Sequence, residues 1–524
     1  MNPHVKTKIL YIMKSIRFLI ILSLLAFFVS CEKDPDLGFF DKQYPTEAPW
    51  PTVTDFEFAV IGNYWMVSGY TGPNYPFMNA RLTLDAESDG LYWNANFSGN
   101  ATTKQLYERD NSSTNSETDN IFNRTYKEIG NACDALDFLA TDPYRNDINK
   151  AQVPRQEGEI RFCRAWTWWV LSTTHIPMYD PAGANSDTYI PWLEHLPTGF
   201  EDAVNQELAT TQQIYDIIVS DLVKAITLLP DKFVAGVHPD SYQYGRANKN
   251  AARALLVRVY MQMNEWALAE DLCDAIIASG DYNLLQDPIE AFNKAYGFAP
   301  VGTEVIWYYL MYEGDGIGSW KIQTTAEQFC RTRRTSEVNP NRSLACSDSF
   351  LETVGWQDPV TKEPTAEALA DKRYNQLYYR YTAATEPNFT LSRAYVWGNK
   401  YYRDRIPNPN AGQRTNIPML RLPEIYLTRA ILRFKNGDVP GATADVNMVR
   451  NRAGVAPLAT VTEDDIHNER WKELNFEGDR TNYLRALHKS VPNGDRGAGS
   501  VAWNSPSWIW PVMEREKELN KAYF

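Results

Sequence analysis

The sequence is poor in the side chains that hold catalytic metals. Its 524 residues include only six histidines and six cysteines, without an H-E-x-x-H motif or a C-x-x-C pair, and zinc sites depend on such closely spaced ligands. Asp85, Glu87 and Asp89 could supply oxygen ligands to calcium, but their alternating spacing fits a strand or a loop equally well. The sequence therefore predicts no metal and no cofactor.

Motifs that bind phosphate or activate a serine are also missing. The sequence has no G-x-S-x-G elbow, Walker loop or G-x-G-x-x-G motif, and we interpret the glycine-rich run 314–319 as a loop. The formal net charge is −13, whereas proteins that bind nucleic acid need clustered Lys and Arg against the phosphates. Nucleic acid is therefore excluded as a partner.

One group of carboxylates is compatible with hydrolysis. Glu469, Glu473 and Glu477 follow at i, i+4 and i+8 of a predicted helix, and glycosidases use two carboxylates across the bond that they cleave. Opposite charges three or four positions apart on a helix usually pair, and basic residues are interleaved here, namely Arg470, Lys472 and Arg480. We therefore interpret the carboxylates as an ion network and predict that the protein is not an enzyme.

The start of the sequence predicts export. Basic residues precede an apolar run over residues 18–29, which is typical of a signal peptide, here residues 1–30. The run has 12 residues, whereas a helix that spans a bilayer needs about 20. The start of translation, at Met1 or Met13, is left open.

The apolar run ends in a lipid-attachment pattern. Val29-Ser30-Cys31 resembles a bacterial lipobox, so Cys31 is the expected site of acylation and residues 31–51, rich in Pro and charge, form a tether. Ordinary secretory cleavage near Ser30 is the alternative. The chain is therefore expected to be exported and lipid-anchored; the resemblance described below implies that the membrane is the outer membrane and that the chain faces the cell surface.

Two stretches show the periodicity of paired helices. Between Ala247 and Ser279, apolar residues recur at helical spacing, the pair Asn264-Glu265 breaks the pattern, and Gly280 follows the second helix, which carries Leu268 on its apolar side. This unit of 33 residues is close to the tetratricopeptide period of ~34 residues. The first apolar stripe consists of Ala252, Leu255, Leu256, Val259 and Met263.

Further helices repeat the pattern. Residues 423–454 form a second unit of similar size, ended by Gly454, and 121–139 with 158–172 form a fainter pair. An amphipathic helix is also predicted over 214–229. The fold class is therefore mostly α, a tetratricopeptide-like scaffold of helix pairs.

Long irregular insertions separate the pairs. They cover about 64–119, 174–209 and 283–419 and are rich in Gly, Pro, Asn, Tyr and Trp. Structureless loops of such length are uncommon, so we expect short strands such as 303–309 within them. Binding residues tend to lie on loops of this kind.

Four stretches of the sequence resemble the SusD/RagB family of surface nutrient-binding lipoproteins from Bacteroidetes. The first, GEIRFCRAW, matches the family's GEA-x-F-x-RA-[FW] helix. The others lie in the same order and spacing as in the family. The four stretches are 158–166, 246–260, 420–427 with 447–454, and 469–480.

This resemblance implies a fold, a partner and an activity. It implies a single domain over residues 52–524 with about four helix pairs, which caps a SusC-like TonB-dependent outer-membrane barrel. The expected activity is capture of an oligosaccharide and its transfer to that transporter. Capture of peptides, as in RagB-type members, is the alternative, and a surface glycoside hydrolase that uses Glu473 or Glu477 is less favoured.

The ligand site is predicted from the chemistry of sugars. An aromatic plane covers the apolar C–H face of a sugar ring, and amides bond its hydroxyls. We expect Trp93, Trp320 and Tyr75 to stack on the ligand and Asn74 and Asn94 to bond its hydroxyls, with Trp356 as a further stacking residue. The alternative for each Trp is a side chain folded back into the core. For Cys330 and Cys346, a disulfide and two thiols are both open.

Overall fold

A computed structural model describes most of the chain after residue 48. The described residues are 49–67, 84–93, 101–110, 112–197, 199–292, 301–310, 333–334, 337–338, 344–382, 393–401 and 416–524. The predicted signal peptide and Cys31 lie outside these ranges, as do Asn74, Tyr75, Asn94, Trp320 and Cys330. The chain divides into two units, residues 1–56 and 57–524, and all contacts given below are within the second.

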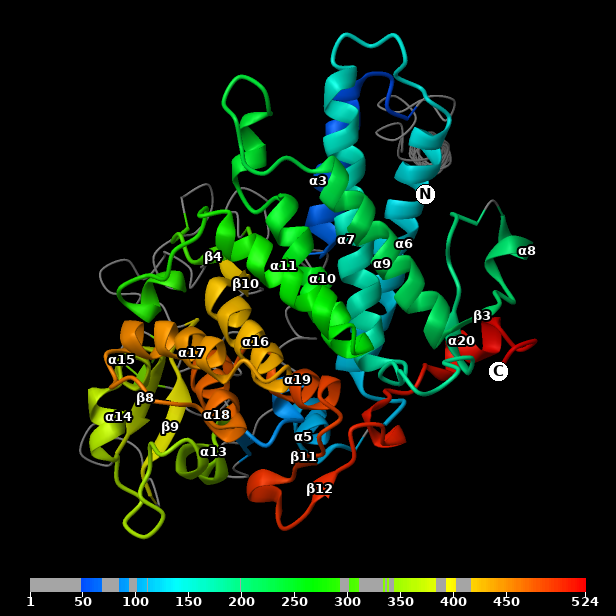
Figure 1. Cartoon of the computed structure of the whole chain (residues 1–524). Coiled ribbons are helices and arrows are strands. Elements are labelled where there is room, and N and C mark those ends of the chain that lie inside the picture. The colour runs from blue at the N-terminus through cyan, green and yellow to red at the C-terminus, as the bar shows by residue number, and fades with distance from the viewer. Residues whose placement is uncertain are drawn as a thin grey trace, which may run out of the picture. The chain divides into compact units, whose positions relative to one another are not determined.

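Helices dominate the structure, and the predicted fold class is confirmed (Figure 1). The helices of the scaffold are α6 (Ser116–Ala140), α7 (Val153–Thr174), α9 (Thr211–Leu228), α10 (Lys249–Met263), α11 (Trp266–Ala278), α16 (Leu422–Lys435), α17 (Val439–Ala453), α18 (Glu463–Leu474) and α19 (Arg480–Ala486). Shorter or flanking helices are α3 (Val53–Val67), α5 (Ala101–Glu108), α8 (Phe200–Ala203), α13 (Asp348–Thr353), α14 (Ala366–Ala370), α15 (Lys372–Leu377) and α20 (Glu514–Leu519).

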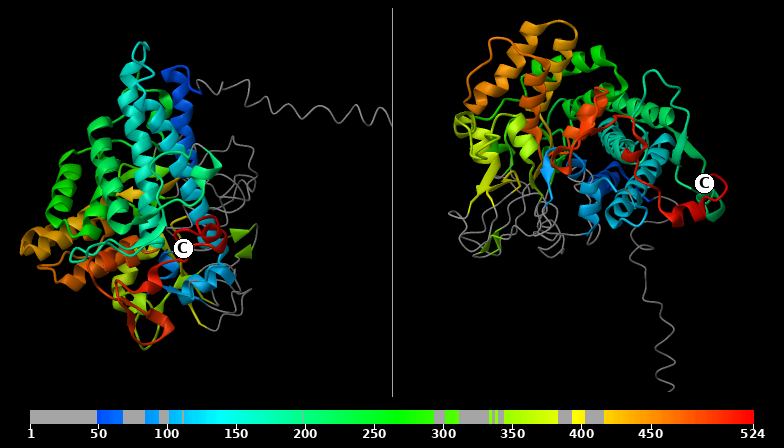
Figure 2. Two further views of the ribbon diagram at one scale, coloured as in Figure 1. Left: turned by 90° about the vertical axis from the view of Figure 1, so that its right-hand side faces the viewer. Right: turned by 90° about the horizontal axis from the view of Figure 1, so that it is seen from below.

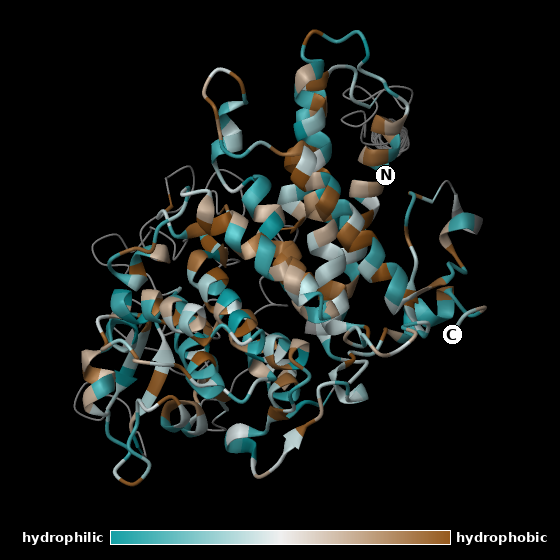
Figure 3. Ribbon diagram, in the orientation of Figure 1, coloured by the Kyte–Doolittle hydropathy of each residue, from teal (hydrophilic) through white to brown (hydrophobic). Residues whose placement is uncertain are grey.

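The scaffold helices pack in chain order. Helix α6 packs on α7, α7 on α9, α9 on α10, α10 on α11, α11 on α16, and α16 on both α17 and α18. Both views of Figure 2 show the green helices between the cyan and the orange ones. Each pair buries its apolar face against the next, which is how tetratricopeptide-like repeats are stabilised. Figure 3 shows the matching alternation of hydrophobic and hydrophilic segments along these helices.

The predicted unit 247–279 is the pair α10 and α11. The side chain of Asn248 caps α10 by accepting a hydrogen bond from the Ala251 N–H at 2.9 Å. Asn264 ends the helix in the left-handed region, with a φ of 60°, and Gly280 follows α11 with a φ of 68°. Of the predicted stripe, Ala252, Leu255, Leu256 and Val259 are all buried.

The second predicted stripe, Leu268, Leu272, Ala275 and Ile276, is buried only at Ile276. Leu268 is 45% exposed, because the face of α11 that packs on the scaffold is shifted by one position and consists of Ala269, Cys273 and Ile276.

In the later pair, the stripe predicted for α16 is buried at Leu427, Ala430 and Ile431 but only partly at Phe434, and the stripe of α17 is buried throughout. Gly454 ends α17 with a φ of 77°. A left-handed residue after a helix favours glycine.

The insertions hold short antiparallel strands. The predicted strand 303–309 is confirmed as β4 (Val305–Tyr309), which pairs with β10 (Ile417–Arg421). The remaining pairs are β1 (Leu91–Tyr92) with β7 (Ala345–Cys346), β2 (Thr188–Pro191) with β3 (Leu208–Thr210), β5 (Arg333–Arg334) with β6 (Glu337–Val338), β8 (Tyr378–Tyr381) with β9 (Tyr395–Gly398), and β11 (Val491–Pro492) with β12 (Ser500–Val501). Among the described helices, none has the length and apolar character needed to cross a membrane.

Candidate ligand-binding site

Of the residues predicted to bind the ligand, the structure describes Trp93, which lies directly after β1, and Trp356. The side chain of Trp93 is partly buried and packs against the main core, and its backbone hydrogen-bonds the hydroxyl of Tyr107. Trp356 lies elsewhere. It is fully buried, with its ring edge-on to Tyr374 and Tyr378 at centroid distances of 5.4 and 5.1 Å. Trp356 is therefore a core side chain that offers no ring face to a ligand.

Three acidic residues, Asp85, Glu87 and Asp89, hold the segment before Trp93 in place through hydrogen bonds to the C-terminal part of the chain. Asp89 accepts two hydrogen bonds from Arg480, both at 3.0 Å, and Asp85 accepts one from the Gly478 N–H at 2.7 Å. Glu87 accepts a hydrogen bond from the Trp510 indole at 2.7 Å. The carboxylates considered for calcium thus each bond to another part of the chain, and no cluster of metal ligands is found among the described residues.

Strand β1 is held in turn by β7 and the residue after it. Leu91 is paired with Cys346 and Tyr92 with Ala345. The Ser347 N–H donates to the Gly90 carbonyl at 3.0 Å, and the Ser347 hydroxyl donates to the Asp89 carbonyl at 2.6 Å. These bonds place Tyr92 and Trp93 at the end of a well-anchored strand.

A stack of two tyrosines and an arginine lies beside this strand. The rings of Tyr92 and Tyr395 are nearly parallel, at 15° and a centroid distance of 6.2 Å. The guanidinium of Arg393 lies 5.2 Å from the first ring centroid and 4.8 Å from the second. Asp348 accepts hydrogen bonds from Arg393 at 2.6 and 2.5 Å. Burial alone would raise the pKa of Asp348, but the bond from Arg393 holds it below its ordinary value.

The hairpin of β8 and β9 supports the stack from behind. Tyr381, Tyr395 and Trp397 are buried in a separate aromatic cluster, against which Tyr92 and Tyr379 are only partly buried. Arg393 retains 32% of its side-chain exposure and Asp348 24%. The result is a rigid aromatic base with a charged pair at its surface, which can cover a C–H face and bond hydroxyls.

No residue of the Tyr92–Arg393–Tyr395 stack was predicted to bind the ligand. The predicted Trp93 packs against the main core, whereas Tyr92, its neighbour in the chain, belongs to the stack. The available pattern was the enrichment of aromatic and β-branched residues in 378–381 and 395–397, which is typical of strands. The pairing of these strands with one another and with β1 requires the fold.

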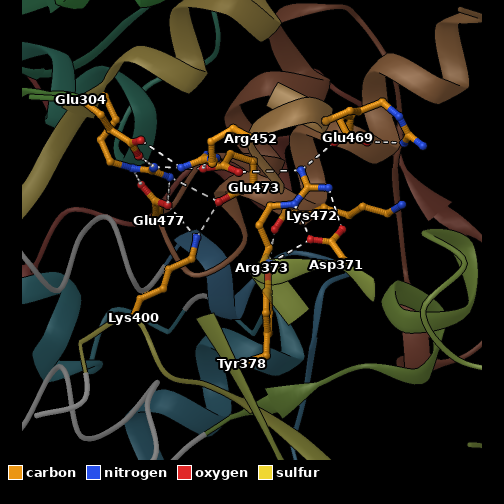
Figure 4. Close-up of polar contacts among 12 residues, drawn as sticks. Glu304, Asp371, Arg373, Tyr378, Lys400, Arg452, Glu469, Lys472, Glu473 and Glu477 are labelled. Carbon is orange, nitrogen blue, oxygen red and sulfur yellow. Dashed lines mark hydrogen bonds and ion pairs between the residues drawn. The ribbon is translucent and has the colours of Figure 1, made fainter. Parts of the chain in front are cut away.

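The three carboxylates considered for hydrolysis lie in a buried ion network (Figure 4). Glu473 contacts Arg452 at 2.6 Å and Arg421 at 3.0 Å. Glu477 contacts Lys400 at 2.6 Å, and Glu469 contacts Arg373 at 2.7 Å. The predicted ion network is therefore confirmed. Its geometry was predicted wrongly in one respect, because α18 ends at Leu474 and Glu477 follows it.

The electrostatics of the network oppose acid/base chemistry. Burial alone would raise the pKa of Glu473, but the guanidinium groups of Arg452, Arg421 and Arg373 hold it well below its ordinary value. A general acid needs a raised pKa and access to the substrate. Glu469, Glu473 and Glu477 are each at most 1% exposed. The carboxylates therefore act as structural anions between helices and insertions.

Comparisons with known proteins agree with this architecture. Residues 50–261 match a family model described as "Starch-binding associating with outer membrane", and residues 304–485 match the model of the SusD family. The chain is 25% identical over 388 residues to the starch-binding protein SusD of Bacteroides thetaiotaomicron, a match that covers 64% of this chain and 65% of that protein.

Solved structures share the fold. A SusD superfamily protein from Bacteroides thetaiotaomicron superposes with a TM-score of 0.71 at 18% identity, covering 90% of this chain and 99% of that one. A SusD-like carbohydrate-binding protein from Bacteroides fragilis gives 0.66 at 19% identity, covering 91% and 99%. With both family models matched along one chain and the same helical scaffold, this protein belongs to the SusD family.

Proposed function

We propose that this protein captures an oligosaccharide at the cell surface and passes it to a SusC-like TonB-dependent outer-membrane transporter without breaking bonds. The observation that carries the proposal is the stack of Tyr92, Arg393 and Tyr395, in which Tyr92 and Arg393 keep part of their surface exposed over the buried ring of Tyr395. The relatives named for starch and carbohydrate binding support the same ligand class.

The chemistry of the site suits capture and release. Aromatic faces cover sugar C–H groups, and the charged pair of Arg393 and Asp348 can exchange hydrogen bonds with hydroxyls. A few stacked rings give modest affinity and fast dissociation, which a protein that must release its cargo requires. We propose that Trp93 contributes one ring of the platform.

The remaining platform residues lie outside the described ranges. We propose that Trp320 and Tyr75 stack on the ligand with Trp93, and that Asn74 and Asn94 bond its hydroxyls. Trp356 is left out, because it is buried. Lipid attachment at Cys31 would hold the site at the outer membrane, in accordance with the description of the matched family model.

The test is calorimetric titration of the parent, Trp93→Ala and Trp320→Ala with soluble starch and a panel of other glycans. Loss of one aromatic plane costs ~1 kcal/mol or more, so each variant should bind roughly tenfold more weakly. Trp65→Ala is the matched control, since Trp65 is 40% exposed on helix α3. Circular dichroism shows whether each variant is folded.

Three outcomes would contradict the proposal. If the folded Trp93→Ala and Trp320→Ala variants both bind as tightly as the parent, the site lies elsewhere on the molecule. If no glycan binds but a peptide does, the cargo is a peptide. A shortened glycan after incubation would reveal hydrolysis.

A further inference from the structure

An open groove on the helical scaffold shares no residue with the Tyr92–Arg393–Tyr395 stack. Helix α7 packs on both α6 and α9 (Figure 1), and the groove is lined by all three of these helices and by the segment 192–195. Its volume, including the part open to solvent, is about 1020 Å³. Ligand pockets in proteins commonly measure ~300–1,000 Å³, so the groove has room for more than one sugar ring.

One end of the groove presents a supported aromatic ring. Trp192 follows β2, and its ring stacks on that of the buried Trp168 at a centroid distance of 5.7 Å and an angle of 28°. The Trp192 N–H donates to the Glu207 carbonyl at 2.7 Å, and the Pro191 carbonyl accepts from the Tyr126 hydroxyl at 2.6 Å. Trp192 itself is only partly buried and lines the groove. Because Trp168 covers one face of its ring, the other face is the one left to a ligand.

Helix α9 adds a row of polar side chains along one wall. Gln213, Asp216 and Ser220 line the groove on successive turns, and all three are exposed. One helical turn is ~5.4 Å, which is close to the length of one sugar ring in a chain. In the described part of the chain, neither the Ser220 hydroxyl nor the Gln213 amide nitrogen has a bonded partner, so both are open to the hydroxyls of a ligand.

Arg161 supplies a charged donor at the far end of this row. Its side chain is 24% exposed and donates to Glu157 and to Asp221, both at 2.8 Å, while its second terminal nitrogen bonds to no described residue. Asp221 directly follows Ser220, whereas Trp192 lies near the start of α9, because β2 pairs with β3 and β3 leads directly into that helix. A ligand that lies along α9 therefore reaches from the aromatic ring to the guanidinium.

The charges in the lining favour an uncharged ligand. Arg161 and Arg164 both bond to Asp221, which is 1% exposed and offsets part of their charge. Three further carboxylates line the groove with no arginine or lysine bound to them within the described ranges, namely Asp137, Glu194 and Asp216. Hydroxyls donate readily to carboxylates, whereas an acidic sugar would be repelled by them.

We infer that this groove is a second glycan-binding site, which takes a neutral linear oligosaccharide. One ring of the sugar stacks on Trp192, and hydroxyls of the neighbouring rings bond to Gln213, Asp216, Ser220 and Arg161. The inference rests on the glycan class of the proposed function but not on the surface stack. A long glycan that spans both sites binds more tightly than either site alone holds it.

Hydroxyl-radical labelling, read by mass spectrometry, tests the inference at the groove itself. The full chain is labelled alone and with maltohexaose, cellohexaose or xylohexaose at equal radical dose. At least one of these neutral sugars should lower the labelling of Trp192 several-fold and leave that of Trp65, which is 40% exposed on α3, unchanged. Hexagalacturonate, which carries a carboxylate on every ring, should protect Trp192 far less. Equal protection by hexagalacturonate would overturn the neutral ligand class.

Two variants of α9 form a matched pair. Ser220→Trp fills the groove, whereas Val223→Trp adds the same ring at a 46% exposed position that does not line it. Ser220→Trp should raise the sugar concentration needed for half-protection of Trp192 at least tenfold, and Val223→Trp should leave that concentration unchanged. Circular dichroism shows whether both variants are folded.

Failure of this site can be distinguished from failure of the surface site, because the labelling of Trp93 is followed in the same experiment. If none of the three neutral sugars protects Trp192 in the parent, or if folded Ser220→Trp is protected at the same concentrations as the parent, the groove is not a glycan site, whatever happens at Trp93. Protection of Trp192 by a lysine-rich peptide and by none of the sugars would likewise overturn the inference. Protection of Trp192 without protection of Trp93 supports this site and counts against the surface site.

Discussion

At the scale of single residues, the strongest constraint on this molecule is buried charge. Glu473 is fully buried and contacts arginines from three other parts of the chain, Arg373, Arg421 and Arg452. Because opposite charges surround it, its carboxylate stays ionised inside the protein. Removing such a charge leaves its partners uncompensated in a medium of low dielectric.

Glu473→Gln should therefore destabilise the fold strongly. Loss of one partner from a buried ion pair costs ~3–5 kcal/mol, which urea denaturation measures as a lower free energy of unfolding. The matched control is Glu363→Gln, because Glu363 is 65% exposed and pairs with Arg380 at 2.8 Å. That change should cost less than ~1 kcal/mol. Equal losses in the two variants would show that the network is not a stabilising element.

A second buried carboxyl has the opposite character. Glu128 on α6 is fully buried, and neither of its oxygens has a hydrogen-bond partner in the structure. Burial raises its pKa well above the ordinary value of 4.5. In the folded state the group is thus held neutral, whereas in the unfolded chain it ionises freely above about that pH.

Glu128→Gln should stabilise the protein at neutral pH. The pKa of Glu128 is higher in the folded than in the unfolded state, so the parent is most stable below the unfolded pKa. As the pH rises above that value, the parent loses ~1.4 kcal/mol of stability per pH unit until the folded pKa is reached. Glutamine does not ionise, so the variant should exceed the parent by on the order of 1–3 kcal/mol at pH 7 and match it near pH 4. Thermal unfolding at both pH values measures this. A gain independent of pH would argue against an ionisable origin.

The ion network also shows what spacing along the sequence can predict. The interleaved charges correctly predicted an ion network around Glu473. The basic residues expected to pair within it, Arg470, Lys472 and Arg480, bond to other carboxylates instead. Arg470 pairs with Asp479, Lys472 with Glu367 and Arg480 with Asp89. Helical spacing identifies neighbours on one helix, whereas the true partners of Glu473 come from distant segments that only the tertiary fold brings together.

At the scale of elements, periodicity predicted the long helices well. The stripes of α10, α16 and α17 are buried except at Met263 and Phe434 near the helix ends, which are partly buried. A helix of 14 or 15 residues repeats its apolar face several times, so its period is visible in the sequence. Helices α13, α14 and α15 have only five or six residues, too few for a period to appear. They were missed within the predicted insertion 283–419.

The pair of helices α10 and α11 provides a matched test of the scaffold. Leu255 is fully buried, whereas Leu268 is 45% exposed. Leu255→Asp would bury an unpaired carboxylate and should unfold the protein or lower its melting temperature strongly. Leu268→Asp should change stability by less than ~0.5 kcal/mol, as surface substitutions usually do. Similar melting temperatures for both variants would show that the α10 stripe is not a core face.

At the scale of the whole molecule, family resemblance predicted more than periodicity did. The four quoted stretches lie inside or at the edge of the two matched family models, which cover 50–261 and 304–485. The ligand platform was less accessible to prediction. An exposed and a buried tryptophan look alike in a sequence, and the burial of Trp356 depends on packing against Tyr374 and Tyr378.

Attachment to the membrane is the remaining property of the whole chain that a single substitution can test. The proposed surface capture needs the protein to stay beside its transporter, and two or three acyl chains on Cys31 would anchor it stably, whereas one chain binds only marginally. Metabolic labelling with an alkyne fatty acid should mark the parent and leave Cys31→Ala unlabelled. Cys330→Ala, a change at another cysteine, should be labelled as the parent is. Unchanged labelling and membrane fractionation of Cys31→Ala would show that this cysteine is not the site of attachment.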